Sequence, residues 1–213
     1  MGALLTVGPQ EPLDPRVAVA AAAAPARGEP RSGDVALAVP CAGGVLLAAI
    51  DGLGRGAAAA TAAERAAALL AARPDDPLAQ LVERCHAELT GTRGAALTVA
   101  RVDADAATLT WLAVGNVAGV VLPAGRAGPG PAALQLAGVV GAQLPQQLVP
   151  VALPLAAGDA LLLSTDGVDS AVGDGLLVRG ALAPLADGLL RRHRRRDSDD
   201  ALVLLARFEP GRL

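Results

Sequence analysis

Three apolar runs follow one another without a helical segment between them, and this order constrains the fold more than any other feature. The runs are Ala95–Val102, Thr108–Val114 and Ala118–Leu122, joined by short turns at Asp103–Ala106 and Gly115–Asn116. Strands joined by such short turns run antiparallel, so the pattern predicts a meander. A doubly wound parallel sheet needs a helix between successive strands, and this part of the chain has none.

The rest of the chain completes an α+β pattern. Gly43-Gly44 separates two apolar runs, Val35–Val39 and Val45–Ile50, and this predicts a β-hairpin. Alanine and leucine dominate Gly56–Ala72, which predicts a helix that Pro74 ends. The remaining predicted elements are a helix from Pro77 to about Leu89, a helix at about Leu182–Arg195, and strands at Val17–Ala24, Leu134–Leu136, Leu148–Leu153, Ala160–Thr165 and Ala201–Arg207.

Length and composition favour one domain over residues 1–213. The 213 residues are 53% apolar, which is enough for a single well-packed core. The net charge of −3 gives no reason to expect a nucleic-acid partner. Cys41 and Cys85 form no disulfide framework, and the N-terminus lacks the pattern of a signal peptide. The run Val17–Ala24 is too short to span a membrane, so we expect a cytoplasmic protein without a membrane segment.

Aspartates stand at the ends of several predicted apolar strands. Asp34 opens the first strand of the hairpin and Asp51 closes the second, so both lie at the same end of the sheet. Asp166 follows another buried strand, and Asp199-Asp200 precede the last one. Carboxylates that converge repel one another unless a cation lies between them. Hard oxygen ligands favour Mg²⁺ or Mn²⁺, so the pattern predicts a carboxylate metal site.

A site of this kind suits the hydrolysis of phosphate esters. Two metal ions can share a water, lower its pKa and aim it at a phosphoryl group. Asp-Gly pairs such as Asp51-Gly52 are common in turns, so a single pair indicates little, whereas the whole set in this order is harder to explain as turns. A rival reading is a dinucleotide-binding turn, from Gly52-x-Gly54-x-x-Ala57 after the strand Val45–Ile50. The meander and the negative charge of Asp51 disfavour it.

Several motifs resemble those of the metal-dependent type 2C (PPM) protein phosphatases, in the SpoIIE branch and most like the RsbX-type serine phosphatases. They follow the family order from about residue 31 to 207. The motifs are Ser32-Gly33-Asp34, Ile50-Asp51-Gly52-Leu53-Gly54-Arg55-Gly56-Ala57-Ala58, Thr92-Arg93-Gly94-Ala95-Ala96, Val114-Gly115-Asn116-Val117, Gly158-Asp159, Leu163-Ser164-Thr165-Asp166-Gly167-Val168 and Ser198-Asp199-Asp200.

The resemblance implies a four-layer αββα sandwich of two antiparallel sheets flanked by helices. It also implies two Mn²⁺ or Mg²⁺ ions: Asp51 would bridge them and the carbonyl of Gly52 would bind one. Asp166 and Asp199 would complete the other site, with Asp200 as an alternative ligand. Asp34 would hold metal-bound water at the edge of the cluster, so that Asp34, Asp51 and Asp166 carry the catalysis.

Two arginines are candidates for binding the substrate phosphate. Arg55 stands where the central family motif usually has histidine, and it is either a phosphate clamp or a solvated side chain. Arg31, three residues before Asp34, is the nearest counterpart of the phosphate-binding arginine of eukaryotic members.

The resemblance therefore implies a protein serine/threonine phosphatase that hydrolyses phosphoserine or phosphothreonine with a metal-activated water. Its implied partner is a phosphorylated regulatory protein, either a STAS-type antagonist or a stressosome scaffold, in a bacterial stress-response pathway of the partner-switching kind. The alternative is a catalytically inactive binding module with the same fold that senses a phosphoprotein. Retention of every expected metal aspartate favours the enzyme.

Overall fold

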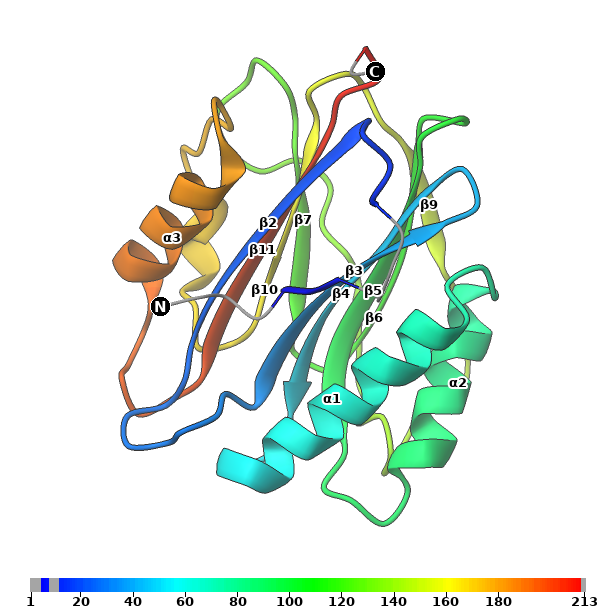
Figure 1. The fold of residues 1–213 in the computed structure, drawn as a ribbon, viewed down its shortest axis with the longest axis vertical. Helices are drawn as coiled ribbons and strands as arrows, with labels where there is room; N and C mark the ends of the chain where they lie inside the picture. The colour runs from blue at the N-terminus through cyan, green and yellow to red at the C-terminus, as the bar shows by residue number, and fades with distance from the viewer. Residues whose placement is uncertain (1–4, 8–11, 212–213) are drawn as a thin grey trace.

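Two β-sheets pack face to face at the centre of the molecule (Figure 1). The computed structural model describes residues 5–7 and 12–211. The first sheet has the order β1-β3-β4-β5-β6-β8, with β9 also paired to β6, and the second has the order β2-β11-β10-β7. The strands are β1 Leu5–Val7, β2 Val17–Ala24, β3 Asp34–Cys41, β4 Gly44–Gly52, β5 Ala95–Asp103, β6 Thr108–Val114, β7 Ala118–Leu122, β8 Gln135–Leu136, β9 Val151–Pro154, β10 Ala160–Ser164 and β11 Ala201–Phe208.

Helices cover the outer faces of both sheets. Helices α1 (Gly56–Ala72) and α2 (Leu78–Leu89) lie on the first sheet, and α3 (Leu182–His193) lies on the second (Figure 1). The short 3₁₀ helix η1 (Ser170–Gly173) packs beside α3. Strand pairing is antiparallel throughout except for β1 with β3 and β6 with β8. The predicted four-layer α+β sandwich is therefore confirmed.

Burial on both faces explains why the central strands are apolar at every position. In β4, Leu46, Ala48 and Ile50 face the helices α1 and α2. The alternate residues Val45 and Leu47 face the second sheet. Because side chains of a strand point alternately to its two faces, a strand between two layers must be apolar throughout.

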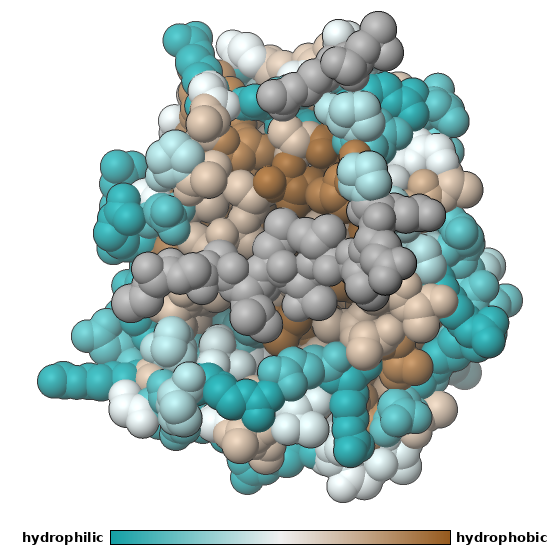
Figure 2. Space-filling model, in the orientation of Figure 1, coloured by the Kyte–Doolittle hydropathy of each residue, from teal (hydrophilic) through white to brown (hydrophobic). Residues whose placement is uncertain are grey.

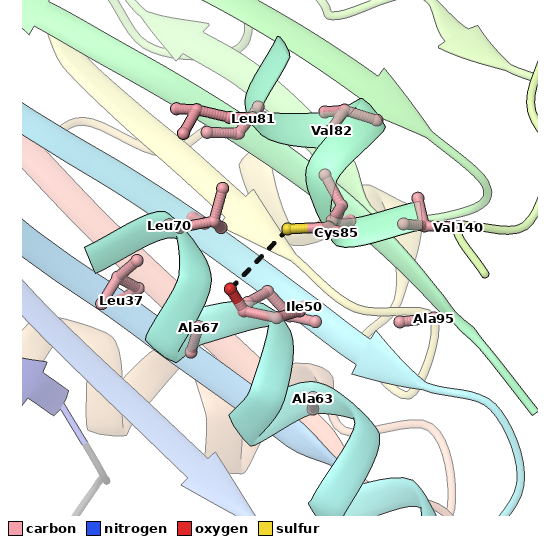
Figure 3. Packing of buried hydrophobic residues seen from close by; sticks show 14 of the residues in the cluster. Leu37, Ile50, Ala63, Ala67, Leu70, Leu81, Val82, Cys85, Ala95 and Val140 are labelled. Carbon is pink, nitrogen blue, oxygen red and sulfur yellow. Dashed lines mark hydrogen bonds between the residues drawn. The ribbon is translucent and has the colours of Figure 1, made fainter. Parts of the chain in front are cut away.

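The contact between helices and first sheet is built from small and branched aliphatic side chains. Figure 3 shows Leu70 of α1 and Leu81 and Cys85 of α2 packed over Leu37 and Ile50 of the sheet. The thiol of Cys85 is buried and lies 3.8 Å from the carbonyl oxygen of Ala66. This cysteine therefore acts as a small apolar residue of the core.

The surface seen in the orientation of Figure 1 is hydrophilic around its outline. Apolar residues lie in the upper middle of this face, between β2 and the β3–β4 hairpin (Figure 2). No helix among the described residues is long and apolar enough to cross a membrane.

Most predicted elements agree with the structure. Helix α1 has the predicted bounds, and the hairpin pairs Val35 with Ile50 and Val39 with Leu46. Two of the strands are displaced or shorter than predicted: β8 covers only Gln135–Leu136, and β9 begins at Val151. Both lie at the border of the first sheet beside β6, where fewer buried positions mark the strand in the sequence.

Candidate active site

A pocket of about 450 Å³ lies at one end of the β-sandwich, where β4 and β10 end. Three aspartates line it: Asp51, Asp166 and Asp199. The other lining residues are Leu53, Gly54, Ala96, Gly115, Asn116, Ala137, Gly138 and Val139. The lining contains no cationic side chain, so the pocket is acidic.

The hairpin places the first two aspartates opposite each other. Asp34 and Asp51 are direct partners in the pairing of β3 with β4, as the turn at Gly43-Gly44 predicts. Asp51 faces the pocket, whereas Asp34 lies behind it and is only 4% exposed. The buried hydroxyl of Thr165 donates a hydrogen bond of 2.6 Å to Asp34 Oδ2. Asp34 thus links the start of β3 to the segment that carries Asp166.

Close backbone packing explains the glycines that follow Asp51 and Asp166. A β-carbon at Gly52 would come within 2.1 Å of the carbonyl oxygen of Ala59 in α1. A β-carbon at Gly167 would come within 1.9 Å of the carbonyl oxygen of Asp200. Neither glycine has a positive φ. Glycine is therefore required at both positions by the close approach of two backbones and not by a backbone conformation that only glycine adopts.

Burial and mutual repulsion raise the pKa of three of the carboxyl groups. The pKa of Asp51 rises to about 7, chiefly because it is buried and also because Asp166 and Asp199 are near. The pKa of Asp34 lies well above its usual range because of burial and the charge of Asp51. Burial and Asp199 likewise raise the pKa of Asp166, against a smaller opposing effect of Arg195. Such shifts mark carboxylates that lack compensating positive charge.

Asp199 and Asp200 are neighbours with different surroundings. Asp199 lines the pocket. Asp200 is buried, and both of its oxygens accept backbone hydrogen bonds, from Ala26 at 2.7 Å and from Gly33 at 2.9 Å. The carboxylate of Asp200 therefore fastens the segment before β3 to the start of β11.

Asn116 is a pocket residue that the sequence reasoning did not select. Its Nδ2 donates a hydrogen bond of 2.8 Å to Asp166 Oδ2, across 50 residues of sequence. The signal available in the sequence was the motif Val114-Gly115-Asn116-Val117, one of those that resemble the phosphatase family. Asn116 fixes one oxygen of Asp166 and leaves the other free to face the pocket.

The segment Ala137–Val139 forms another wall of the pocket, and it is held from outside. Ala95 and Val140 exchange two backbone hydrogen bonds of 2.9 Å. The backbone N–H of Gly141 donates a hydrogen bond of 3.0 Å to His86 Nδ1 on α2. The side chain of His86 thus supports this wall.

The donor set fits hard divalent cations. The aspartates offer only oxygen ligands to the pocket, and the raised pKa values of Asp51 and Asp166 indicate an uncompensated negative charge. In the described part of the chain, no three Asp, Glu, His or Cys side chains converge closely enough to hold one ion by themselves. Mg²⁺ usually keeps several waters and takes only one or two carboxylates, so spaced ligands around a pocket suit it.

The two candidate phosphate-binding arginines lie outside the pocket lining. Arg31 makes contacts of 2.5 and 2.6 Å with the two carboxylate oxygens of Glu64 on α1. Arg55 occupies the N-cap position of α1, next to Gly54, and its side chain is exposed.

One family model matches this chain. The family model described as "Stage II sporulation protein E (SpoIIE)" matches residues 42–209. No curated protein sequence matches the chain.

Three solved structures are similar over nearly the whole chain. A chain from a study of the bacterial stressosome, described as a modular system adapted to control secondary messenger signaling, is 29% identical, with a TM-score of 0.81 over 90% of this chain and 99% of that chain. RsbX in complex with magnesium is 19% identical, with a TM-score of 0.78 over 91% of this chain and 96% of that one. The phosphatase domain of SpoIIE from Bacillus subtilis, with a fragment of its regulatory domain, is 22% identical, with a TM-score of 0.73 over 90% of this chain and 63% of that chain.

Proposed function

This chain belongs to the SpoIIE family, and we propose that it acts as a serine/threonine phosphatase like RsbX. It would use two divalent cations to remove phosphate from phosphoserine or phosphothreonine in a regulatory protein. The observation that carries the proposal is the pocket lined by Asp51, Asp166 and Asp199. Their carboxylates come from three separate segments, and the pKa values of Asp51 and Asp166 are raised. A cation would relieve this repulsion.

We propose that Asp51, Asp166 and Asp199 share in holding the ions, because these three carboxylates line the pocket. The carbonyl of Gly52 is a further ligand that the family resemblance suggests, and waters would complete the coordination of each ion. Asp199 is preferred to Asp200 because it lines the pocket, whereas both oxygens of Asp200 already accept backbone hydrogen bonds. Asp34 is placed behind this set, where it can accept a hydrogen bond from a water at the edge of the cluster. When bound, Mn²⁺ or Mg²⁺ would lower the pKa of a water that then attacks phosphorus.

The protein's own contribution is positioning. The hydrogen bond from Asn116 orients Asp166, and the hydrogen bond from Thr165 orients Asp34. Leu53, Ala137 and Val139 supply apolar walls that restrict bulk water around the phosphoryl group. The open face of the pocket leaves room for a phosphorylated side chain on a folded partner.

The partner that we propose is a phosphorylated component of a stress-signalling assembly. One similar structure comes from a bacterial stressosome and another is RsbX. A further similar structure contains the RsbU and RsbW domains of Rv1364c from Mycobacterium tuberculosis. A STAS-type antagonist or a stressosome scaffold would present phosphoserine or phosphothreonine on a protein surface. Cys41 and Cys85 are both unpaired, which fits the reducing cytoplasm in which we place this activity.

The test is hydrolysis of p-nitrophenyl phosphate and of a phosphoserine peptide by the purified chain, with Mn²⁺, with Mg²⁺ and with a chelator. We expect turnover that depends on the metal and that the chelator abolishes. Absence of turnover with either metal, in protein that remains folded, would contradict the enzyme and favour the inactive phosphoprotein-binding module.

A further inference from the structure

No positively charged side chain lines the pocket that the proposed function gives to a phosphoryl group, although the charge of Arg195 acts on Asp166 from outside the lining. Its lining carries three carboxylates and no arginine or lysine. Two divalent cations on three carboxylates would leave a net charge of only about +1, whereas a phosphate monoester carries nearly two negative charges at neutral pH. A guanidinium at the rim would complement that charge, because its planar donors match phosphate oxygens.

The two arginines that the sequence suggested are poorly placed for this task. Arg31 is engaged with both oxygens of Glu64, and it lines a separate hollow with Asp34 behind the pocket. Arg55 follows the pocket residue Gly54 but does not line the pocket itself. Among the described residues, neither arginine makes a hydrogen bond or ion pair with a residue that lines the pocket.

Arg93, in the turn between α2 and β5, lies against the pocket wall. A β-carbon built on Gly54 would come within 2.3 Å of Arg93 Nη1 and 3.2 Å of its Cδ. Gly54 is a lining residue of the pocket, together with Asp51. The guanidinium therefore occupies the space that any larger side chain at position 54 would take, at the rim of the acidic pocket.

The turn that carries Arg93 is fixed to the same wall. The backbone N–H of Leu53 donates a hydrogen bond of 2.9 Å to the carbonyl of Gly94. The hydroxyl of Thr92 donates to the carbonyl of Leu89 at 2.6 Å and accepts from the N–H of Gly94 at 3.0 Å. The backbone of Arg93 is thus held between two anchored neighbours, so its side chain starts from a defined position beside the pocket.

The donors of Arg93 are available for a ligand. Its side chain is exposed and makes no hydrogen bond or ion pair with the residues that the structure describes. By contrast, Arg16, Arg31, Arg194 and Arg207 each bind a carboxylate. We propose that Arg93 binds the phosphoryl oxygens of the substrate at the rim of the pocket. This inference rests on the proposed phosphatase function and adds to it the residue that recognises the phosphate.

The test compares Arg93→Ala with Arg93→Lys and with two control variants. Arg55→Ala removes the rival arginine next to Gly54. Arg65→Ala removes an exposed arginine on α1 that makes no hydrogen bond or ion pair with another described residue. For each protein, KM and kcat are measured with p-nitrophenyl phosphate, inhibition by inorganic phosphate is titrated, and Mn²⁺ affinity is measured by calorimetry.

We expect Arg93→Ala to weaken inhibition by phosphate and to raise KM by about 10- to 100-fold, the usual effect of losing a charge-assisted hydrogen-bond pair. Arg93→Lys should recover only part of the loss, since lysine keeps the charge but lacks the planar fork. Mn²⁺ affinity should be unchanged, and Arg65→Ala should behave as the unmodified protein.

Two results would overturn the assignment. One is Arg93→Ala with unchanged KM and unchanged inhibition by phosphate, while the unmodified protein is active. The other is a loss of Mn²⁺ affinity or of folding that accounts for the whole effect, which would give Arg93 a structural role. If the unmodified protein shows no turnover, the phosphatase proposal fails separately. Calorimetric titration of inorganic phosphate into the Mn²⁺-treated proteins then tests phosphate binding by Arg93 separately. Weaker phosphate binding by Arg93→Ala than by the unmodified protein supports the assignment, and equal or absent binding refutes it.

Discussion

The two ends of the β-sandwich both carry aspartates, but only at the pocket end do some of them lack hydrogen-bond donors or positive charges nearby. At the end opposite the pocket, Arg16 binds Asp14 at 2.7 Å and Asp105 at 2.8 Å. Asp103 and Asp159 each accept two backbone hydrogen bonds from neighbouring turns. The hydrogen bond from Arg16 lowers the pKa of Asp14.

At the pocket end, the aspartates that line the pocket have fewer partners and raised pKa values. Asp51 makes no hydrogen bond through its side chain to another described residue, and burial with neighbouring carboxylates raises its pKa to about 7. Asp166 receives a single side-chain hydrogen bond, from Asn116, and its pKa is also raised. The same residue type at the end of a strand is therefore structural where donors satisfy it and a potential ligand where they do not.

The largest effect that this comparison predicts is on activity. Asp51→Asn should lower kcat by about 1,000-fold or more, because it removes the carboxylate proposed to contact both cations. The fold should persist, since the asparagine has the same shape. Circular dichroism and kcat of Asp51→Asn, measured beside Asp159→Asn from the opposite end, test this contrast. Near-normal turnover of Asp51→Asn would remove the functional difference between the two ends.

Asp200 is the exception at the pocket end, because both of its oxygens are satisfied. Asp200→Ala would leave the buried N–H groups of Ala26 and Gly33 without acceptors. We expect a loss of about 2–4 kcal/mol in the free energy of unfolding. Urea denaturation measures it, with Asp197→Ala, an exposed residue nearby, as control. Equal stability of the two variants would show that Asp200 does not fasten this segment.

The pH dependence of stability should distinguish the ends in metal-free protein. The folded-state pKa of Asp51, about 7, lies above the ordinary aspartate value of 3.8, so between these values the folded state binds more protons than the unfolded state. The free energy of unfolding should therefore fall as pH rises from about 4 to about 7, by roughly 2 kcal/mol after allowing for solvent in the pocket.

Asp51→Asn should make this slope smaller without abolishing it, because the pKa values of Asp34 and Asp166 are also raised by burial. Thermal unfolding in chelator between pH 4 and pH 8 measures it. Asp14 has a lowered pKa, so it contributes stability that is present above its unfolded value and is lost only at more acidic pH. An unchanged slope in Asp51→Asn would assign the titration to the other carboxyl groups.

The smallest effect is expected at the end opposite the pocket, where hydrogen-bond donors satisfy the aspartates. Asp159→Ala removes two backbone hydrogen bonds of 2.8 Å, from Ala124 and Ala156, at a half-buried site. We expect a loss of about 1 kcal/mol, which lowers Tm by roughly 2–4 °C in a chain of this size, with kcat unchanged. A fall in kcat that exceeds the loss of folded protein would mean that this end also takes part in catalysis.

The sequence predicted the strands well because the pattern of burial is strong. The central strands are apolar on both faces, and α1 lies between clear signals, Gly56 at its start and Pro74 after its end. The placement of Asp34 opposite Asp51 also followed from the sequence, because a hairpin with a short turn fixes its own register.

Contacts between distant segments could not be predicted in this way. Asn116 reaches Asp166 across 50 residues, and Arg93 reaches Gly54 through the packing of a turn against a loop. Asp199 and Asp200 are chemically alike and adjacent, and only the backbone direction before β11 determines which one faces the pocket. Periodicity reports which face of an element is buried, but it carries no information on which loops meet at its end.

Metal binding by the uncompensated carboxylates is the central claim, and calorimetric titration of Mn²⁺ tests it most directly. The unmodified protein and Asp159→Asn should both bind about two ions, as two-metal hydrolases do, whereas Asp51→Asn should lose most of the binding. If the unmodified protein binds no Mn²⁺, or if Asp51→Asn binds as many ions with the same affinity, the pocket is not the metal centre and the account is contradicted.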